Sequence, residues 1–382
     1  MTGYLLVWFT YYVTQTTTVL PRRQRATGTV RPADTRRHHR AVLLQHLVDH
    51  GATSRADLAR ESGLTRVTVS DLVAELINDE LVTDIGPRPG GTRVGKPATL
   101  VDIAEHSPVI VAIDLSDDTG FTGALIDLSG SVLHHDQAEF TRGTAALDVI
   151  ADLTTRIIAT ASRPVLGVGV GTPGIVGTDG HVLQAPNLQW ENVDLAADLG
   201  RRTGLPVSVG NDANLATVAE CAFGEGDDAG LLMITVGQGV GGGICIDGAS
   251  VTGPLLSAGE IGHVVVDPDG ADCACGNRGC LETFLSAPAL RALPDTDARA
   301  HAGRLLGSVL TPIVTTLGIA DVVLHGPTEL LDGPVLDAAR ETLARQTLPF
   351  VARKIRIRLI AHDDLVLTGA AALVRFRELG VV

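Results

Sequence analysis

Three of the five cysteines in this 382-residue chain lie within eight residues, at Cys273, Cys275 and Cys280. His263 precedes this group by ten residues. Thiolate and imidazole groups are the ligands that zinc prefers, and four of them complete a tetrahedral site. His263, Cys273, Cys275 and Cys280 are therefore predicted to bind one Zn²⁺. Because four protein ligands leave no open position for a catalytic water, the predicted role of the ion is structural.

Redox sensing is the alternative role for three closely spaced thiols. The position of the histidine favours the metal site over this alternative. The other two cysteines, Cys221 and Cys245, are expected to be small buried side chains. Five cysteines with this distribution do not indicate a disulfide framework, so the expected compartment is the reducing cytoplasm.

The charge of the chain is divided unevenly along its length. Residues 1–100 hold thirteen Lys and Arg against nine Asp and Glu, a net charge of +4, so the remaining 282 residues carry −18 of the total of −14. Hydrophobic residues make up 45% of the chain and charged residues 19%, which is typical of a globular protein with two or three domains. The basic beginning and the acidic remainder suggest a DNA-facing end joined to an acidic body.

Residues 4–13 are unusually aromatic and hold all three tyrosines. This run is shorter than the roughly 20 apolar residues that span a bilayer, and no positive charge precedes it as in a signal peptide. We therefore expect no membrane association and interpret residues 1–33 as a disordered or misassigned extension. A membrane-associated or secretory element and a segment packed on the body are the alternatives.

Residues 34–101 have the pattern of a winged helix-turn-helix. Apolar spacing predicts a helix over 34–49, Thr53 and Ser54 can cap a helix over 55–61, and Thr65 can cap a third helix that ends near residue 78. Strands are expected at 81–85 and 97–101, joined by a basic loop. A small helical oligomerisation module is the alternative. The side chains predicted to contact phosphates and base edges of DNA are Ser54, Arg55, Thr65, Arg66, Thr68, Ser70, Arg88 and Arg93.

The composition changes after residue 107 to short apolar runs rich in glycine. These runs alternate with helical stretches at 146–161 and 307–317, which predicts an α/β body whose sheets are buried between helices. The runs that we interpret as strands lie at residues 109–114, 123–127, 166–170, 231–236, 243–247, 322–324 and 365–367.

The body resembles the ROK family, which includes bacterial sugar kinases and sugar-responsive repressors. The resemblance extends over residues 36–382, and its most specific part is the His-x9-Cys-x-Cys-x4-Cys spacing, followed two residues later by Glu282. Motifs similar to those of the family occur in the family's order: the substrate-lobe turn at 171–174, the aspartate motif at 210–214, the second phosphate loop at 237–243, and the zinc and sugar signature at 259–282. The resemblance implies a two-lobed, actin-like ATPase fold over residues 107–382.

The resemblance also implies a sugar site made of groups that hydrogen-bond to hydroxyls. The positions that match the family's sugar contacts are Asn211, Asp212, Glu260, His263 and Glu282. His263 can serve both sites, because one ring nitrogen can bind zinc while the other faces the sugar. The alternative for Asp212 and Asn214 is a purely structural role in capping a helix that begins near Ala213.

The elements that would bind ATP depart from the family's pattern. In ROK kinases a turn of the form Asp-x-Gly-Gly-Thr follows the first strand, but here residues 114–119 read Asp-Leu-Ser-Asp-Asp-Thr. Two carboxylates bring bulk and negative charge toward a polyanion. The later Gly-Gly pair is altered as well, since residues 324–327 read Leu-His-Gly-Pro, whereas Gly369 is retained.

Retained sugar residues and altered ATP residues favour a sugar-responsive repressor over a kinase. Asp212 would then be a vestigial general base, and the chain would not be an enzyme. The expected partners are operator DNA, a sugar or sugar-phosphate effector, and a second copy in a homodimer or homotetramer. An ATP-dependent sugar kinase or a bifunctional protein is the alternative.

Overall fold

The computed structural model of the chain describes residues 32–87, 98–224 and 230–381. Residues 1–31, which form most of the predicted extension, lie outside the described residues, as do Arg88 and Arg93 of the predicted basic loop. Within the described ranges, no helix combines the length and the apolar character that crossing a membrane requires.

The N-terminal region contains three helices and a small antiparallel sheet with the order β1-β3-β2. The three helices and the last two strands follow the order predicted for a winged helix-turn-helix, whereas β1, at residues expected only to cap a helix, was not predicted. Its elements are α2 (Pro32–His50), β1 (Thr53–Ser54), α3 (Arg55–Ser62), α4 (Arg66–Asn78), β2 (Val82–Pro87) and β3 (Thr99–Ile103).

Local capping sets the ends of α3 and α4 as the sequence predicts. The Ser54 hydroxyl accepts a hydrogen bond from the Asp57 backbone N–H, and the Thr65 hydroxyl accepts one from Thr68. These bonds satisfy N–H groups that have no partner inside the helix, which explains why each helix begins at the residue after the cap. The inner face of α4 is fully buried, with Val69, Leu72 and Leu76 each 0% exposed.

A five-stranded mixed sheet forms the first half of the body, with the order β11-β7-β4-β5-β6. Helices α5 and α6 cover one face of this sheet and share its apolar core. A separate three-stranded sheet is formed by β8, β9 and β10, which come between β7 and β11 along the chain. The elements of this half are β4 (Val109–Asp114), β5 (Gly120–Ile126), β6 (Val132–Glu139), α5 (Ala145–Thr160), β7 (Val165–Thr172), β8 (Ile175–Val176), β9 (Val182–Ala185), η1 (Pro186–Leu188), β10 (Trp190–Val193), α6 (Leu195–Thr203) and β11 (Val207–Asn211).

A second five-stranded mixed sheet, with the order β14-β13-β12-β15-β16, forms the other half of the body. Helices α10 and α12 pack on one of its faces. The elements of this half are α7 (Asp212–Phe223), β12 (Leu231–Val236), β13 (Val240–Ile246), β14 (Ala249–Ser250), η2 (Ile261–His263), α8 (Glu282–Leu285), α9 (Ala287–Ala292), α10 (Thr296–Leu317), β15 (Asp321–His325), α11 (Thr328–Leu331), α12 (Pro334–Gln346), α13 (Pro349–Ala352), β16 (Arg356–Ile360) and α14 (Leu365–Leu379).

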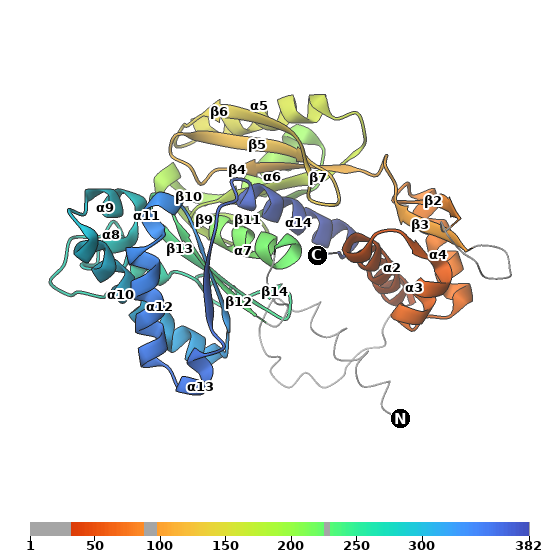
Figure 1. Ribbon diagram of the computed structural model, residues 1–382. Helices are drawn as coiled ribbons and strands as arrows, with labels where there is room; N and C mark the ends of the chain where they lie inside the picture. Colours follow the sequence, from red (N-terminus) through yellow and green to blue (C-terminus); the bar gives the residue numbers. More distant parts are fainter. Residues whose placement is uncertain (1–31, 88–97, 225–229, 382) are drawn as a thin grey trace.

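Helices α7 and α14 lie between the two large sheets (Figure 1). Leu367, Ala370 and Val374 of α14 join the core that covers β4 and β5, whereas Ala216 and Ala219 of α7 pack on β12. Each sheet therefore has helices on both faces, as the apolar runs of the sequence predict.

The interpretation of residues 365–367 as a strand is wrong, because these residues begin α14. A run of three apolar residues fits a buried strand and a buried helix equally well, and the small residues that follow favour the helix. The last strand of the second sheet is instead β16, whose alternating arginines hid it from the search for apolar runs.

Candidate functional site

The four predicted zinc ligands come together in the loop of residues 259–282, called the Cys-His loop below. One ring nitrogen of His263 and the Sγ atoms of Cys273, Cys275 and Cys280 all lie within 4.8 Å of one another. The Sγ atom of Cys273 lies 3.6 Å from Nδ1 of His263, and the Sγ atoms of Cys275 and Cys280 are 3.7 Å apart. A tetrahedral zinc ion separates its ligand atoms by roughly 3.3–3.8 Å. The cluster is therefore compatible with a zinc site.

The electrostatics of the three thiols also fit a divalent cation. Burial raises the pKa of the Cys280 thiol to about 12, and burial raises the pKa of Cys273 as well. The backbone N–H of Asn277 lowers the pKa of Cys275. Three thiolates in so small a volume would repel one another, and a zinc ion bound between them would supply the compensating positive charge.

The backbone of the Cys-His loop folds around the thiols through a tight turn. The N–H of Cys273 donates to the carbonyl of Asn277, and the N–H of Gly276 donates to Cys273. Gly279 has a φ of +65°, and a Cβ atom at this position would lie 1.5 Å from the carbonyl oxygen of Asp267. Only glycine fits here, so the glycine before the last cysteine is fixed by the approach of the opposite strand of the loop.

The residues at the start of α7 are held in place by an N-terminal cap. The Oδ1 atom of Asn211 accepts from the Asn214 N–H at 3.0 Å, and its amide donates to the Gly174 carbonyl and to Asp212. The bond to Gly174 joins the substrate-lobe turn to the aspartate motif. Asn211 is thus the capping residue of α7, while the Asp212 carboxylate accepts from the Ala213 N–H.

Burial and two nearby carboxylates raise the pKa of Asp212. Burial raises the pKa of Asp212 to about 7, and the charges of Asp114 and Glu260 add to this effect. Burial likewise raises the pKa of Asp114 to about 6, with Asp117 and Asp364 contributing. Asp212 and Asp114 therefore have pKa values closer to neutral pH than an ordinary aspartate.

The two glutamates predicted to contact a sugar have different environments. The Glu260 side chain is 45% exposed, and its carboxylate lies 3.9 Å from Nε2 of His263. His263 thus directs Nδ1 to the thiols and Nε2 toward Glu260. The Glu282 carboxylate instead accepts from the backbone N–H of Val240 at 3.0 Å and lies 3.7 Å from Cys273 Sγ. It connects the Cys-His loop to the beginning of β13, a role that the sequence did not indicate.

The turn of residues 114–119, called the acidic turn below, contacts the second phosphate loop directly. The side-chain amide of Gln238, between β12 and β13, donates to Oδ1 of Asp118 at 3.1 Å. The Asp114 and Asp117 carboxylates accept from the backbone N–H groups of Ser116 and Thr119 within the turn. Backbone donors that a glycine turn would offer to phosphate are here bonded to the turn's own carboxylates.

The predicted DNA contacts fall into two groups. Arg66 and Ser70 lie exposed on the first turns of α4, close to Val67, which is 70% exposed. Ser54 is only 3% exposed and caps α3, and Arg55 forms two hydrogen bonds with the Asp84 carboxylate of β2. Ser54 and Arg55 thus hold the region together in this structure.

The two mixed sheets and the Cys-His loop can be compared with those of known protein families. The sequence profile of the ROK family matches residues 110–377, and the chain belongs to the ROK family.

Two relatives in the genus Caldicellulosiruptor are named as repressors. The putative xylose repressor of Caldicellulosiruptor sp. strain Rt8B.4 is 30% identical over 87% of this chain and 83% of its own length. The xylose repressor of Caldicellulosiruptor bescii is 34% identical over 66% of this chain and 64% of its own length. Glucokinases match over shorter spans, as in Thermotoga maritima, with 36% identity over 48% of this chain and 58% of that enzyme.

A solved structure shares the fold over nearly the whole chain. It is a ROK family transcriptional regulator described as a homolog of the E. coli MLC protein, with a TM-score of 0.77 and 24% identity over 91% of this chain and 98% of that one. The ROK glucokinase of Streptomyces griseus, solved with glucose and AMPPNP, covers 70% of this chain with a TM-score of 0.61 and 25% identity. The two-lobed fold predicted from the resemblance is thereby confirmed.

Proposed function

We propose that this protein is a sugar-responsive transcriptional repressor without kinase activity. One contrast carries the proposal: the residues that match the family's sugar contacts are held in place, whereas the acidic turn is bonded to Gln238 of the second phosphate loop. The repressor relatives, which match a larger share of the chain than the glucokinases do, support the same function.

The proposed sugar site uses acceptors and an imidazole around the start of α7. Asp212 and Glu260 would accept hydrogen bonds from sugar hydroxyls, while Nε2 of His263 and the remaining lone pair of Asn211 Oδ1 complete the set. Glu282 would hold the site in place through its hydrogen bond from the Val240 N–H, and its carboxylate would also accept a hydrogen bond from a sugar hydroxyl. Hydrogen bonds to charged groups are worth about 1.5–3 kcal/mol each. The names of the two Caldicellulosiruptor relatives make D-xylose the first sugar to test.

In this proposal zinc has a structural role. His263, Cys273, Cys275 and Cys280 would hold the ion, which supplies positive charge and fixes the loop when it is bound. The protein's own contribution is to fix the imidazole of His263, so that its Nε2 atom faces Glu260 at the sugar site.

The N-terminal region would bind operator DNA through α4. Arg66, Thr68 and Ser70 start this helix and would face base edges and phosphates in the major groove, with Arg88 and Arg93 near a minor groove. Two copies of the chain in a homodimer, or four in a homotetramer, would place two such helices on a pseudopalindrome that we expect to be rich in A·T pairs.

Arg66→Ala tests the DNA assignment. Its control is Arg60→Ala, an exposed arginine of α3 that pairs with Asp57 and is not among the predicted DNA contacts, and this control should leave binding unchanged. The duplex is one that the protein selects from a random-sequence pool, and binding is measured by fluorescence anisotropy at several salt concentrations. Arg66→Ala should weaken binding about 10- to 100-fold. Equal binding by Arg66→Ala and the unmodified protein at every salt concentration would refute α4 as the recognition helix.

The competing function is an ATP-dependent sugar kinase. The pKa of Asp212, about 7, suits a general base, and glucokinases are among the relatives. A thermal-shift panel of D-xylose, D-glucose, N-acetyl-D-glucosamine and their phosphates identifies the effector. Release of ADP is then measured with that sugar and Mg-ATP. A sugar that raises the melting temperature without ADP release supports the repressor, and sugar-dependent ADP release would establish the kinase.

A further inference from the structure

Helix α14 contacts both the candidate sugar site and the DNA-binding region. Its first turns pack on α7, which begins at Asp212. A Cβ atom at Gly369 of α14 would lie 1.9 Å from the carbonyl oxygen of Leu215, so the two helices meet backbone to backbone. At this position no side chain lies between the two helices, so a displacement of α7 is expected to move α14.

The middle of α14 is also fixed to the body. Arg375 is 1% exposed, its Nη1 atom donates to the Leu128 carbonyl at 2.6 Å, and its guanidinium lies 4.7 Å from the ring centroid of Phe223, the last residue of α7. Burial lowers the pKa of Arg375 to about 10, and the carboxylate of Asp49 in α2 opposes this shift. The charge of Asp49, in the first helix of the N-terminal region, therefore acts on a buried residue of α14.

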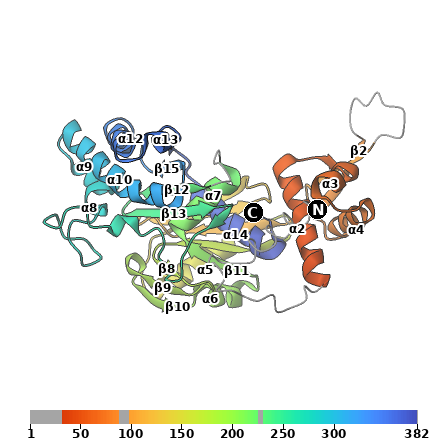
Figure 2. The same ribbon diagram turned by 90° about the horizontal axis from the view of Figure 1, so that it is seen from below.

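The end of α14 enters the core of the DNA-binding region. Val381 is 1% exposed and belongs to the apolar cluster that includes Leu44 and Leu47 of α2. A Cβ atom at Gly380 would lie 3.1 Å from Cβ of Ala41. Both ribbon views place the end of α14 beside α2 (Figures 1 and 2).

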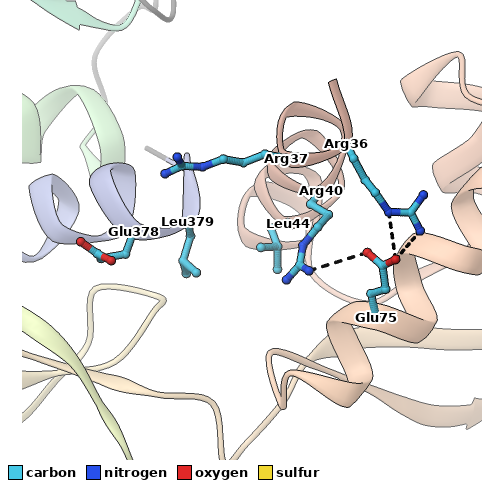
Figure 3. A pocket seen from close by; sticks show the side chains of 7 residues that line it. All are labelled: Arg36, Arg37, Arg40, Leu44, Glu75, Glu378 and Leu379. Carbon is cyan, nitrogen blue, oxygen red and sulfur yellow. Dashed lines mark hydrogen bonds and ion pairs between the residues drawn. The ribbon is translucent and has the colours of Figure 1, made fainter. Parts of the chain in front are cut away.

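One polar contact crosses this junction directly. The Nη2 atom of Arg37 in α2 donates to the carbonyl of Arg377 at 2.9 Å, and Arg377 in turn donates to the Thr178 carbonyl, in the segment that follows the substrate-lobe turn. Figure 3 shows Arg37 reaching toward α14, while Arg36 and Arg40 turn toward Glu75 of α4.

The junction is not closely packed over its whole area. A pocket of about 330 Å³ separates the two helices, and its lining includes Leu44 and Glu378. Two helices whose interface includes an unfilled pocket can change their relative orientation at a low cost in free energy. Helices in a fully packed core cannot.

We propose that α14 transmits sugar occupancy at the start of α7 to the orientation of the DNA-binding region, through the contacts of Arg37 and Val381. This proposal rests on the proposed repressor function. The alternative route is the connection of residues 104–108, which Arg163 holds by donating to the Glu105 carbonyl at 2.6 Å. The two routes differ in which side chains should be needed for the effect of sugar on DNA affinity.

The test measures the ratio of DNA affinities of the full-length, zinc-loaded protein with and without the sugar found in the thermal-shift panel. The ratio cancels any direct effect of a side chain on DNA, and a coupled pair of sites gives a ratio of about 5–150. The variants are Arg37→Ala, Val381→Ser and their combination. The controls are Arg36→Ala, which alters the neighbouring arginine on α2, and Arg163→Ala on the alternative route.

We expect the double variant to bring the ratio below about twofold, with sugar affinity within about twofold of the unmodified protein. Arg37→Ala changes an exposed side chain and keeps the test valid if Val381→Ser fails to fold; alone, it should at least halve the ratio. The proposal is overturned if the ratio is kept in these variants or is lost in Arg163→Ala alone. A ratio of one in the unmodified protein would instead overturn the repressor function itself, so the two failures are distinguishable.

Discussion

The Cys-His loop and the acidic turn differ in the charge that suits them: the loop suits a cation, whereas the turn disfavours an anion. In the loop, three thiols and an imidazole converge within 4.8 Å, an arrangement that is compatible with a zinc ion. In the acidic turn, the carboxylates bond to backbone N–H groups of their own turn and to Gln238, which disfavours an anion. The comparison teaches why the two regions support the proposed repressor: one has the donor set of a metal site, whereas the other presents carboxylates where the family's kinases have glycines.

The largest effect is expected from the Cys-His loop. Cys280→Ser removes a fully buried ligand and should reduce bound zinc from one equivalent to less than about 0.2, with loss of sugar binding, because structural zinc contributes directly to folding free energy. Zinc is measured by elemental analysis and sugar binding by calorimetry. Cys221→Ser, outside the cluster, is the control and should keep the metal. A full equivalent of zinc in Cys280→Ser would refute the ligand set.

Asp212→Asn should weaken sugar binding about 10- to 100-fold, because a charged acceptor becomes neutral. The same change should raise the melting temperature at pH 8. The folded-state pKa of about 7 lies above the ordinary 3.8, so the ionised carboxylate lowers stability above pH 7, and this cost disappears as the pH falls from 7 toward 4.

The expected gain from Asp212→Asn at pH 8 is a few degrees, and it should shrink at pH 5. Calorimetric melting at both values checks it. Glu260→Gln alters an exposed carboxylate at the same site and should weaken sugar binding without this pH-dependent gain. A lower melting temperature for Asp212→Asn at pH 8 would show that Asp212 stabilises the fold.

Replacing Asp117 and Asp118 together by glycine tests the acidic turn. Two fewer negative charges should strengthen binding of Mg-AMPPNP about tenfold or more, because each charge near the phosphates costs about 1 kcal/mol even in water. Titration calorimetry measures this affinity. If the unmodified protein already binds Mg-AMPPNP with micromolar affinity, the acidic turn does not disfavour an anion and its contrast with the Cys-His loop fails.

The smallest effect is expected from Gln238→Ala, which removes only the hydrogen bond to Asp118. An exposed bond of this kind contributes about 0.5–1.5 kcal/mol, so sugar affinity should change by less than about tenfold. A larger loss would show that this single bond sets the separation of the two sheets.

Local chemistry made much of the fold predictable. Thr65 has the side chain of a capping residue, and the predicted third helix begins at Arg66 and ends at Asn78 as expected. The apolar runs at residues 109–114 and 231–236 begin and end at the same residues as strands β4 and β12. Residues 365–367 were assigned wrongly because a short apolar run carries no period, and only the packing of α14 between the sheets decides its form.

The candidate site was predictable where spacing along the chain is short. The ligand cluster at His263, Cys273, Cys275 and Cys280 could be named from the sequence, because its members lie within eighteen residues of one another. The roles of Glu282 and Arg55 could not, since their partners Val240 and Asp84 are 42 and 29 residues away. Such pairings depend on how strands and helices are brought together.

The sequence by itself determined the cysteine spacing, the helix caps and the carboxylates of the acidic turn, because these depend on neighbours a few residues apart. Only the tertiary structure decided which carboxylates share the space around Asp212, that Asp118 meets Gln238, and that α14 joins α7 to α2. The physical reason is that burial and electrostatic coupling depend on distance in space, and residues up to 340 positions apart meet at these contacts.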